Sequence, residues 1–135
     1  MARFLLDSHV FLWAKEDPGQ IDEKALETIR APENRLFVSL AGLWELAIKA
    51  ANGKLPHYSL IIAKGADALS KSLQDSNIEL MAIEMSHALA AAALPQHHKD
   101  PFDRLMIAQA LEEDMILATR DAVFARYVGL NLLRV

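Results

Sequence analysis

The chain has no cysteine among its 135 residues. This absence excludes disulfide bonds, zinc sites built on thiolates and cysteine nucleophiles, and it is consistent with a reducing cytosol. No run of about 18 apolar residues occurs. The N-terminal segment MARFLLDSHVFLW is short and is interrupted by Arg3, Asp7 and His9. We therefore expect neither a signal segment nor a membrane span, and we expect a cytoplasmic protein.

The chain also lacks an excess of basic residues. It has 14 Lys and Arg against 18 Asp and Glu, for a net charge of −4. Nucleic-acid-binding domains usually carry a basic surface, so this charge argues against a simple binding domain. It argues less against an enzyme whose acidic site is neutralised by divalent cations. The length predicts one domain over residues 1–135, and a hydrophobic fraction of 53% is sufficient for a core.

Glycine is missing from residues 7–11, the segment that follows the first apolar run. Its absence excludes the glycine-rich loops with which dinucleotide-binding and P-loop proteins hold phosphate. A phosphatase that forms an aspartyl-phosphate typically needs a second acid two residues after the first, and here Asp7 is followed at that spacing by His9. The Gly-x-Ser-x-Gly elbow of serine hydrolases is absent as well.

Short apolar runs alternate with segments of helical period along the whole chain. Strands are predicted at Arg3–Leu6, Arg35–Ser39, 79–83, Ile116–Thr119 and 131–135. Helices are predicted at 22–30, Leu40–Ala51, 59–73, 86–94 and 101–113, with Asp22, Ser86 and Asp100 as N-caps. This alternation is typical of an α/β fold with a parallel sheet covered by helices on both faces. Such a sheet binds ligands at the carboxyl ends of its strands.

Four acidic residues fall at or near that edge. Asp7 and Asp121 directly follow the first and fourth strands, and Glu45 lies in the helix after the second. Asp103 lies in the first turn of the helix that leads to the fourth strand. The three aspartates could also cap or begin helices, and Glu45 could form a solvated pair with Lys49. Crowded carboxylates are unfavourable without a cation, and oxygen ligands suit Mg²⁺ or Mn²⁺ rather than zinc.

Other polar residues near these acids have open interpretations. Arg104 and Arg120 adjoin two of the acids, so they could contact nucleic-acid phosphates or form salt bridges with those acids. We interpret His97 and His98 as solvated, because they lie in a polar loop beside Lys99.

The chain resembles the PIN-domain ribonucleases, and more narrowly the VapC toxins of bacterial toxin–antitoxin pairs. The resemblance covers residues 5–9, 39–49, 94–110 and 119–121, and DPFDRLMIAQA at residues 100–110 is its most specific part. It implies a three-layer α/β/α sandwich around a parallel five-stranded sheet. It also implies Mg²⁺-dependent endonuclease action on RNA, a homodimer, and a cognate antitoxin that blocks the site.

The resemblance assigns roles residue by residue. The family's acidic quartet, which is catalytic and binds metal, is matched by Asp7, Glu45, Asp103 and Asp121. Asp7 and Asp103 match the positions most consistently assigned to the metal. Ser8 matches a position that is often threonine, and we expect Ser8 and Thr119 to support the site.

Two further expectations concern partners and alternatives. Trp13, beside three apolar residues, predicts a partly exposed apolar patch suited to a dimer or antitoxin contact. Three other functions stay open: an inactive PIN-fold binding protein, a magnesium hydrolase of small phosphoesters, and a structure-specific DNA nuclease.

Overall fold

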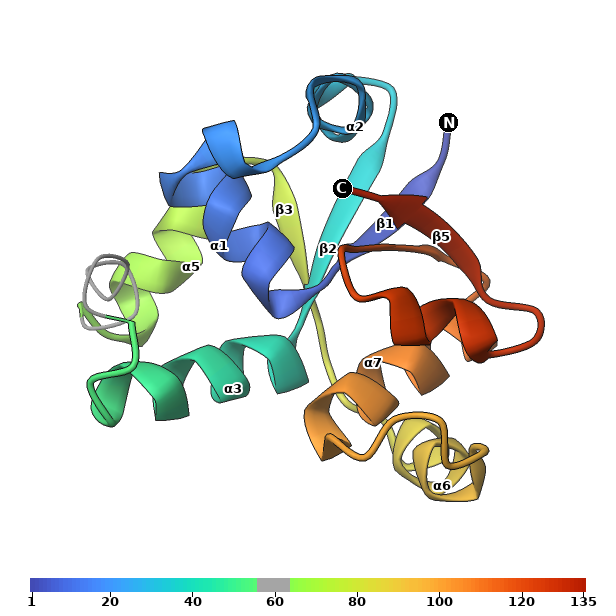
Figure 1. Cartoon of the computed structure of the whole chain (residues 1–135). Helices are drawn as coiled ribbons and strands as arrows, with labels where there is room; N and C mark the ends of the chain where they lie inside the picture. Colours follow the sequence, from blue (N-terminus) through green and yellow to red (C-terminus); the bar gives the residue numbers. More distant parts are fainter. Residues whose placement is uncertain (56–63) are drawn as a thin grey trace.

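A parallel sheet of five strands lies at the centre of the fold (Figure 1). The structure, a computed structural model, describes residues 1–55 and 64–135. The strands follow the order β3-β2-β1-β4-β5, and each neighbouring pair is parallel. They are β1 (Arg3–Leu6), β2 (Arg35–Ser39), β3 (Ile78–Met81), β4 (Ile116–Thr119) and β5 (Asn131–Arg134). The predicted five-stranded parallel sheet is therefore confirmed.

The strand boundaries agree with the prediction for β1, β2 and β4. Strand β5 ends one residue before the predicted end. Strand β3 begins at Ile78 and ends at Met81 rather than at residue 83. Among the described strands its neighbour is β2, and the last register pair is Ser39 with Met81. Because β2 ends at Ser39, the chain beyond Met81 loses its pairing with β2, and the predicted extension to residue 83 is wrong.

Helices occupy most of the connections between strands. They are α1 (Ser8–Glu16), α2 (Glu23–Arg30), α3 (Leu40–Ala51), α5 (Ala66–Asp75), α6 (Met85–Ala93) and α7 (Pro101–Glu112), with 3₁₀ turns η1 (Pro18–Gln20) and η2 (Ala122–Arg126). Asp22 and Asp100 accept hydrogen bonds from backbone N–H groups in the first turns of α2 and α7, as predicted for N-caps.

One predicted helix start is wrong, and another predicted helix is interrupted. Helix α6 begins one residue early, at Met85, because the Glu84 carbonyl accepts the first helical bond from Ala88 N–H. Glu84, not Ser86, is therefore the N-cap. Residues 59–63 of the predicted helix at 59–73 lie outside the described residues. Gly65 then has φ +93°, which a helix does not allow, so α5 begins at Ala66.

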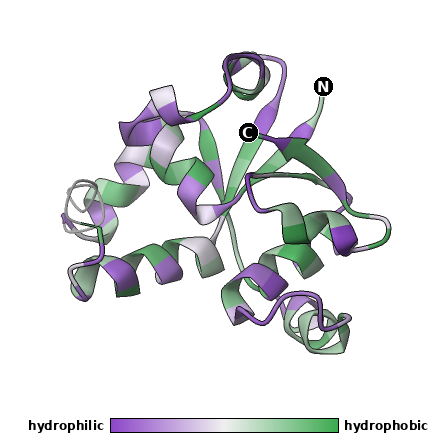
Figure 2. Cartoon of the chain, in the orientation of Figure 1, coloured by the Kyte–Doolittle hydropathy of each residue, from purple (hydrophilic) through white to green (hydrophobic). Residues whose placement is uncertain are grey.

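Side chains on the two faces of the sheet enter separate cores. Phe4 and Leu6 on β1 pack in a core with residues of α1, α2 and α5. Leu5, between them, faces a second core shared with α7 and η2. Figure 1 shows α1 and α5 on one side of the sheet and α7 on the other, with α6 packed against α7. Figure 2 shows the strands mostly in the green of hydrophobic residues. These layers form the expected α/β/α sandwich.

The strand order defines where a site can form. From β1 the chain turns to β2 on one side, and it later returns to β4 on the other. The carboxyl ends of β1 and β4 thus form a topological switch point, where open α/β sheets bind ligands. Asp7 N–H donates to the Ala118 carbonyl at 3.0 Å, which holds the two strand ends together. Within residues 1–55 and 64–135, none of the helices has the length and apolar composition needed to cross a bilayer.

Candidate metal centre

A pocket of about 400 Å³ opens at the switch point and is lined by acidic side chains. They come from separate elements of the fold: the turn after β1, helix α3, the start of α7 and the turn after β4. The acids in this lining are Asp7, Glu45, Asp100, Asp103 and Asp121. The structure therefore brings together the four acids singled out in the sequence, and it adds Asp100, the N-cap of α7.

Asp7 serves both as a helix cap and as a wall of the pocket. Its Oδ1 accepts a hydrogen bond from Ser8 N–H at 2.7 Å, and its Oδ2 accepts one from the Thr119 hydroxyl at 2.8 Å. Burial raises the pKa of Asp7, and the Glu45 charge adds to the effect, while the bonds from Thr119 and Ser8 oppose it. Thr119 Oγ1 also accepts from Asp121 N–H at 3.1 Å, so one hydroxyl links two of the acids.

Glu45 is buried, with 5% of its surface exposed. Its Oε1 accepts a hydrogen bond from the Ser8 hydroxyl at 2.8 Å, and Lys49 lies 3.1 Å from its Oε2. The pair with Lys49 therefore exists, but it borders the pocket instead of lying free in solvent. A Cβ added at Gly42 would lie 3.7 Å from Ser8 Cβ. Gly42 on α3 therefore packs closely against Ser8 at the start of α1.

Asp103 has a strongly perturbed acidity. Only 15% of its side chain is exposed. Burial is the main cause that raises its pKa from 3.8 to about 8, and the charges of Asp7, Asp100, Glu45 and Asp121 add to it. Oxygens of Glu45, Asp100 and Asp103 lie within 4.8 Å of one another. A divalent cation would relieve this repulsion, and an all-oxygen donor set fits a hard ion.

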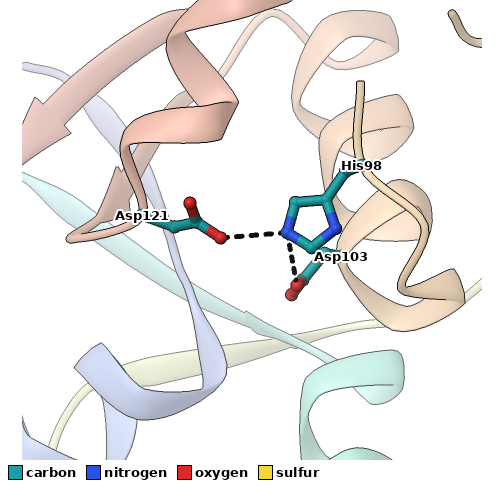
Figure 3. A group of neighbouring side chains, drawn as sticks. All are labelled: His98, Asp103 and Asp121. Atoms are coloured by element: carbon teal, nitrogen blue, oxygen red, sulfur yellow. Dashed lines mark hydrogen bonds and ion pairs between the residues drawn. The ribbon is translucent and has the colours of Figure 1, made fainter. Parts of the chain in front are cut away.

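Asp121 is linked to Asp103 by the side chain of His98 (Figure 3). Its Oδ2 lies 2.9 Å from His98 Nε2, which also lies 3.0 Å from Asp103 Oδ2. Burial opposes ionisation of Asp121, but bonds from Val123 N–H and His98 outweigh burial and lower the pKa.

The prediction of a solvated His98 is wrong, since only 16% of its side chain is exposed. Tyr127 Oη accepts from His98 N–H at 2.9 Å and draws the loop inward. Tyr127 and Asp121 lie more than 20 residues from His98 in the sequence, so local patterns carry no signal for these two contacts. His97 is exposed, as predicted.

Arg104 does not have either of its predicted roles. It is buried, and its guanidinium donates to four backbone carbonyls at 2.7–3.2 Å, those of Ala91, Leu94, Pro95 and His98. It therefore fastens the end of α6 and the following loop to α7. With its donors used in this way, it is not available to contact RNA, and it forms no salt bridge with Asp103 in the described part of the chain.

Arg120 remains at the rim of the pocket. Its guanidinium lies over the Trp13 ring at 4.3 Å from the centroid, and it donates to the carbonyls of Val135 and Gln20. It forms no ion pair with Asp121 among the described residues. Trp13 is thus half-buried beneath Arg120, and Trp44, with 59% exposed, is the more exposed tryptophan. Val10, Phe11 and Leu12 beside Trp13 are fully buried, so the prediction of an apolar patch around Trp13 is wrong.

The sequence of this chain matches the profile of the PIN domain over residues 4–130. The chain belongs to the PIN-domain family. A curated relative, Ribonuclease VapC22 of Mycobacterium tuberculosis, is 30% identical over 122 residues, which is 90% of this chain and 88% of the relative.

Solved structures share the fold of this PIN domain. VapBC2 from Rickettsia felis, bound to a DNA fragment from its promoter, aligns with a TM-score of 0.71 and 18% identity over 98% of both chains. VapBC-1 from nontypeable Haemophilus influenzae aligns with a TM-score of 0.65 and 15% identity, over 98% of this chain and 97% of that chain. The resemblance seen in the sequence is thereby confirmed at the level of family and fold.

Proposed function

We propose that this PIN domain is a metal-dependent endoribonuclease and the toxin of a type II toxin–antitoxin pair. The observation that carries the proposal is the pocket at the switch point. There, a carboxyl group with a pKa of about 8 is surrounded by further acids. Perturbed acids in a pocket are typical of a functional site. The relationship to a VapC ribonuclease supports RNA as the substrate.

The proposed cofactor is Mg²⁺, with Mn²⁺ as a substitute. Asp7 and Asp103 are the first candidates to hold it, and Glu45 and Asp121 are the next. A divalent ion bound by carboxylates lowers the pKa of water and neutralises charge on a phosphodiester. Ser8 and Thr119 keep Asp7 in place, because each donates a hydrogen bond to a different oxygen of its carboxylate.

Two cations at the pocket are suited to the substrate backbone. Arg120 and Lys49 both line the pocket beside the acids. Arg120 is held by two carbonyls and by the Trp13 ring, so it loses little freedom on binding a phosphate. We assign it, rather than the buried Arg104, to contact with RNA.

The proposed partners are an antitoxin and a second copy of the chain, in the cytoplasm where RNA is available. The structural neighbours that are named as VapBC or toxin–antitoxin complexes support the antitoxin. Protein contact is supported by apolar residues exposed on α3, β3 and α6, namely Leu40, Trp44, Leu80, Met85 and Leu89. Large exposed apolar side chains on neighbouring elements are typical of interaction surfaces.

An RNA cleavage assay tests the enzymatic function. The folded protein should cut RNA with Mg²⁺ and lose this activity in EDTA. Asp7→Asn, which keeps the shape of the side chain and removes its charge, should abolish cutting while thermal melting shows a folded protein. A parallel assay on single-stranded and structured DNA separates RNA from DNA cleavage. Undiminished cutting in EDTA or by Asp7→Asn would refute the proposal.

A further inference from the structure

A histidine side chain bridges two of the acids at the pocket. His98 Nε2 lies 3.0 Å from Asp103 Oδ2 and 2.9 Å from Asp121 Oδ2 (Figure 3). The three residues come from the loop before α7, from α7 itself and from the turn after β4. One ring nitrogen therefore joins two parts of the chain that carry separate acids.

The ring of His98 is held in one orientation. Its Nδ1 accepts a hydrogen bond from Asp100 N–H at 3.2 Å. Its backbone is fixed on both sides, because Tyr127 Oη accepts from its N–H at 2.9 Å and Arg104 donates to its carbonyl at 3.2 Å. The ring also packs edge-on against Phe124, at 5.4 Å between centroids. Nε2 is thus aimed at the two carboxylates by contacts that do not involve either of them.

The bond from Asp100 defines which nitrogen carries the hydrogen of a neutral ring. Nδ1 acts as an acceptor, so the hydrogen lies on Nε2 and points toward Asp103 and Asp121. If Nε2 bound a cation directly, its hydrogen would move to Nδ1 and face the Asp100 N–H. This hydrogen-bond network therefore favours Nε2 of His98 as a hydrogen-bond donor rather than as a metal ligand. The side chains of His98, Asp103 and Asp121 nevertheless lie close enough together to share an ion.

We infer that His98 is a positioning residue of the metal centre, whose Nε2–H holds Asp121 against Asp103. Asp121 lies on a turn with 37% of its side chain exposed; Val123 N–H holds its Oδ1, and His98 holds its Oδ2. The hydrogen bond to Asp121 Oδ2 uses one lone pair of that carboxylate and leaves the others for a cation. Partners of this outer shell typically change metal affinity by about 10–100-fold when they are removed. The inference rests on the proposed function only in requiring a bound divalent ion.

A matched pair of variants distinguishes the role of Nε2 from that of Nδ1 in the His98 ring. His98→Gln extends an amide N–H to the place of Nε2, whereas His98→Asn retains a polar atom near Nδ1 and does not reach the acids. Mn²⁺ affinity is measured by calorimetry, without RNA. We expect His98→Asn to bind about 10–100-fold more weakly than the wild type and His98→Gln to stay within a few-fold of it. His87→Asn, on α6 beside the C-terminal end of α7, is the control and should bind Mn²⁺ normally.

The opposite pattern would show that His98 only holds its loop. Rescue by His98→Asn instead of His98→Gln would mean that the bond to Asp100 is the important one, and it would overturn the inference. A ¹⁴N coupling from imidazole in the electron spin echo of the Mn²⁺-loaded wild type that disappears in His98→Gln would make His98 a ligand and would also overturn it, whereas His9, which lines the same pocket, is unchanged in that variant. Tight Mn²⁺ binding without RNA cleavage would leave the inference intact and refute the proposed function alone.

Discussion

The two ends of helix α7 carry the same arrangement of a histidine and two carboxylates, with different surroundings. At the N-terminal end, His98 Nε2 faces Asp103 and Asp121. At the C-terminal end, His87 Nε2 lies 3.1 Å from Glu113 and 3.9 Å from Glu112. In both histidines, Nδ1 accepts a hydrogen bond from a backbone N–H.

The difference lies in where the carboxylates are. The side chains of Glu112 and Glu113 are 34% and 44% exposed, so solvent screens their charges. Asp103 is 15% exposed and faces further acids, and its pKa is raised to about 8. His87 is itself buried and connects the start of α6 to the end of α7. Burial and crowding of the acids, rather than the histidine motif, distinguish the end of α7 that forms the candidate metal centre.

Removing the Asp103 carboxylate should have the largest effect of the substitutions that compare the two ends of α7. Asp103→Asn deletes the carboxylate that contacts both His98 and the acid cluster. We expect RNA cleavage to fall by roughly 100-fold or more, since the divalent ion loses a ligand. The matched control at the other end, Glu113→Gln, should cut RNA like the wild type. Comparable losses in the two variants, measured by initial cleavage rates, would contradict the comparison.

The acidity of Asp103 predicts a pH dependence of metal binding. Its proton must leave before the carboxylate can bind a cation, and its pKa is about 8 in the metal-free protein. Affinity for Mg²⁺ should therefore rise about tenfold per pH unit below that value and level off above it. Calorimetric titrations between pH 6 and 9 measure this slope. A Mg²⁺ affinity that does not change over this pH range would show that Asp103 is already ionised throughout it.

The same shift predicts how the stability of the metal-free protein depends on pH. The folded state holds the Asp103 proton up to about pH 8, whereas the ordinary value of 3.8 applies when the chain unfolds. The folded state therefore binds more protons in this window, and its stability should fall as pH rises from about 4 to 8. Melting curves without metal should show a smaller fall for Asp103→Asn. An equal fall in both proteins would exclude Asp103 as the cause.

Substitution of Arg104 should lower the stability of the fold more than the loss of a single hydrogen bond at His98 or His87. Its planar guanidinium reaches four carbonyls, which a lysine ammonium cannot match. Arg104→Lys should lower the free energy of unfolding by about 2–3 kcal/mol, because buried carbonyls lose their donors. Urea denaturation measures the change. Arg120→Lys, at an exposed position, is the control and should change stability little.

The smallest effect is expected at His87. His87→Leu keeps the volume buried but removes the bonds to Glu84 and Glu113. Stability should fall by about 1–2 kcal/mol, while Mg²⁺ affinity stays that of the wild type. Denaturation and calorimetry on the same preparation test both statements. A loss of metal affinity would show that the two ends of α7 are coupled.

Local features of the fold could be predicted from the sequence. Asp22 and Asp100 cap their helices through bonds that span three residues or fewer, and such bonds depend on nearby residues alone. The strands at Arg3–Leu6 and Ile116–Thr119 were predictable from short apolar runs. The end of β3 was not, because it depends on where its neighbour β2 ends.

The candidate site shows the same difference between features that depend on nearby residues and features that depend on distant ones. Its acids could be named because a parallel sheet gathers the residues that follow its strands at one edge. Ser8 and Thr119 could be named as supporting residues, but the acid that each of them binds could not. The bond from Ser8 to Glu45 crosses 37 positions, and the bond from Thr119 to Asp7 crosses 112.

The sequence by itself determined the family, the alternation of strands and helices, and the set of acids that the strand ends bring together. The tertiary structure alone decided that His98 faces two of those acids, that Arg104 is buried among carbonyls, and that Arg120 covers Trp13. The physical reason is the range of each interaction. Caps and apolar periods are set by neighbours within a turn or two, whereas burial and long-range hydrogen bonds exist only after the sheet has been assembled.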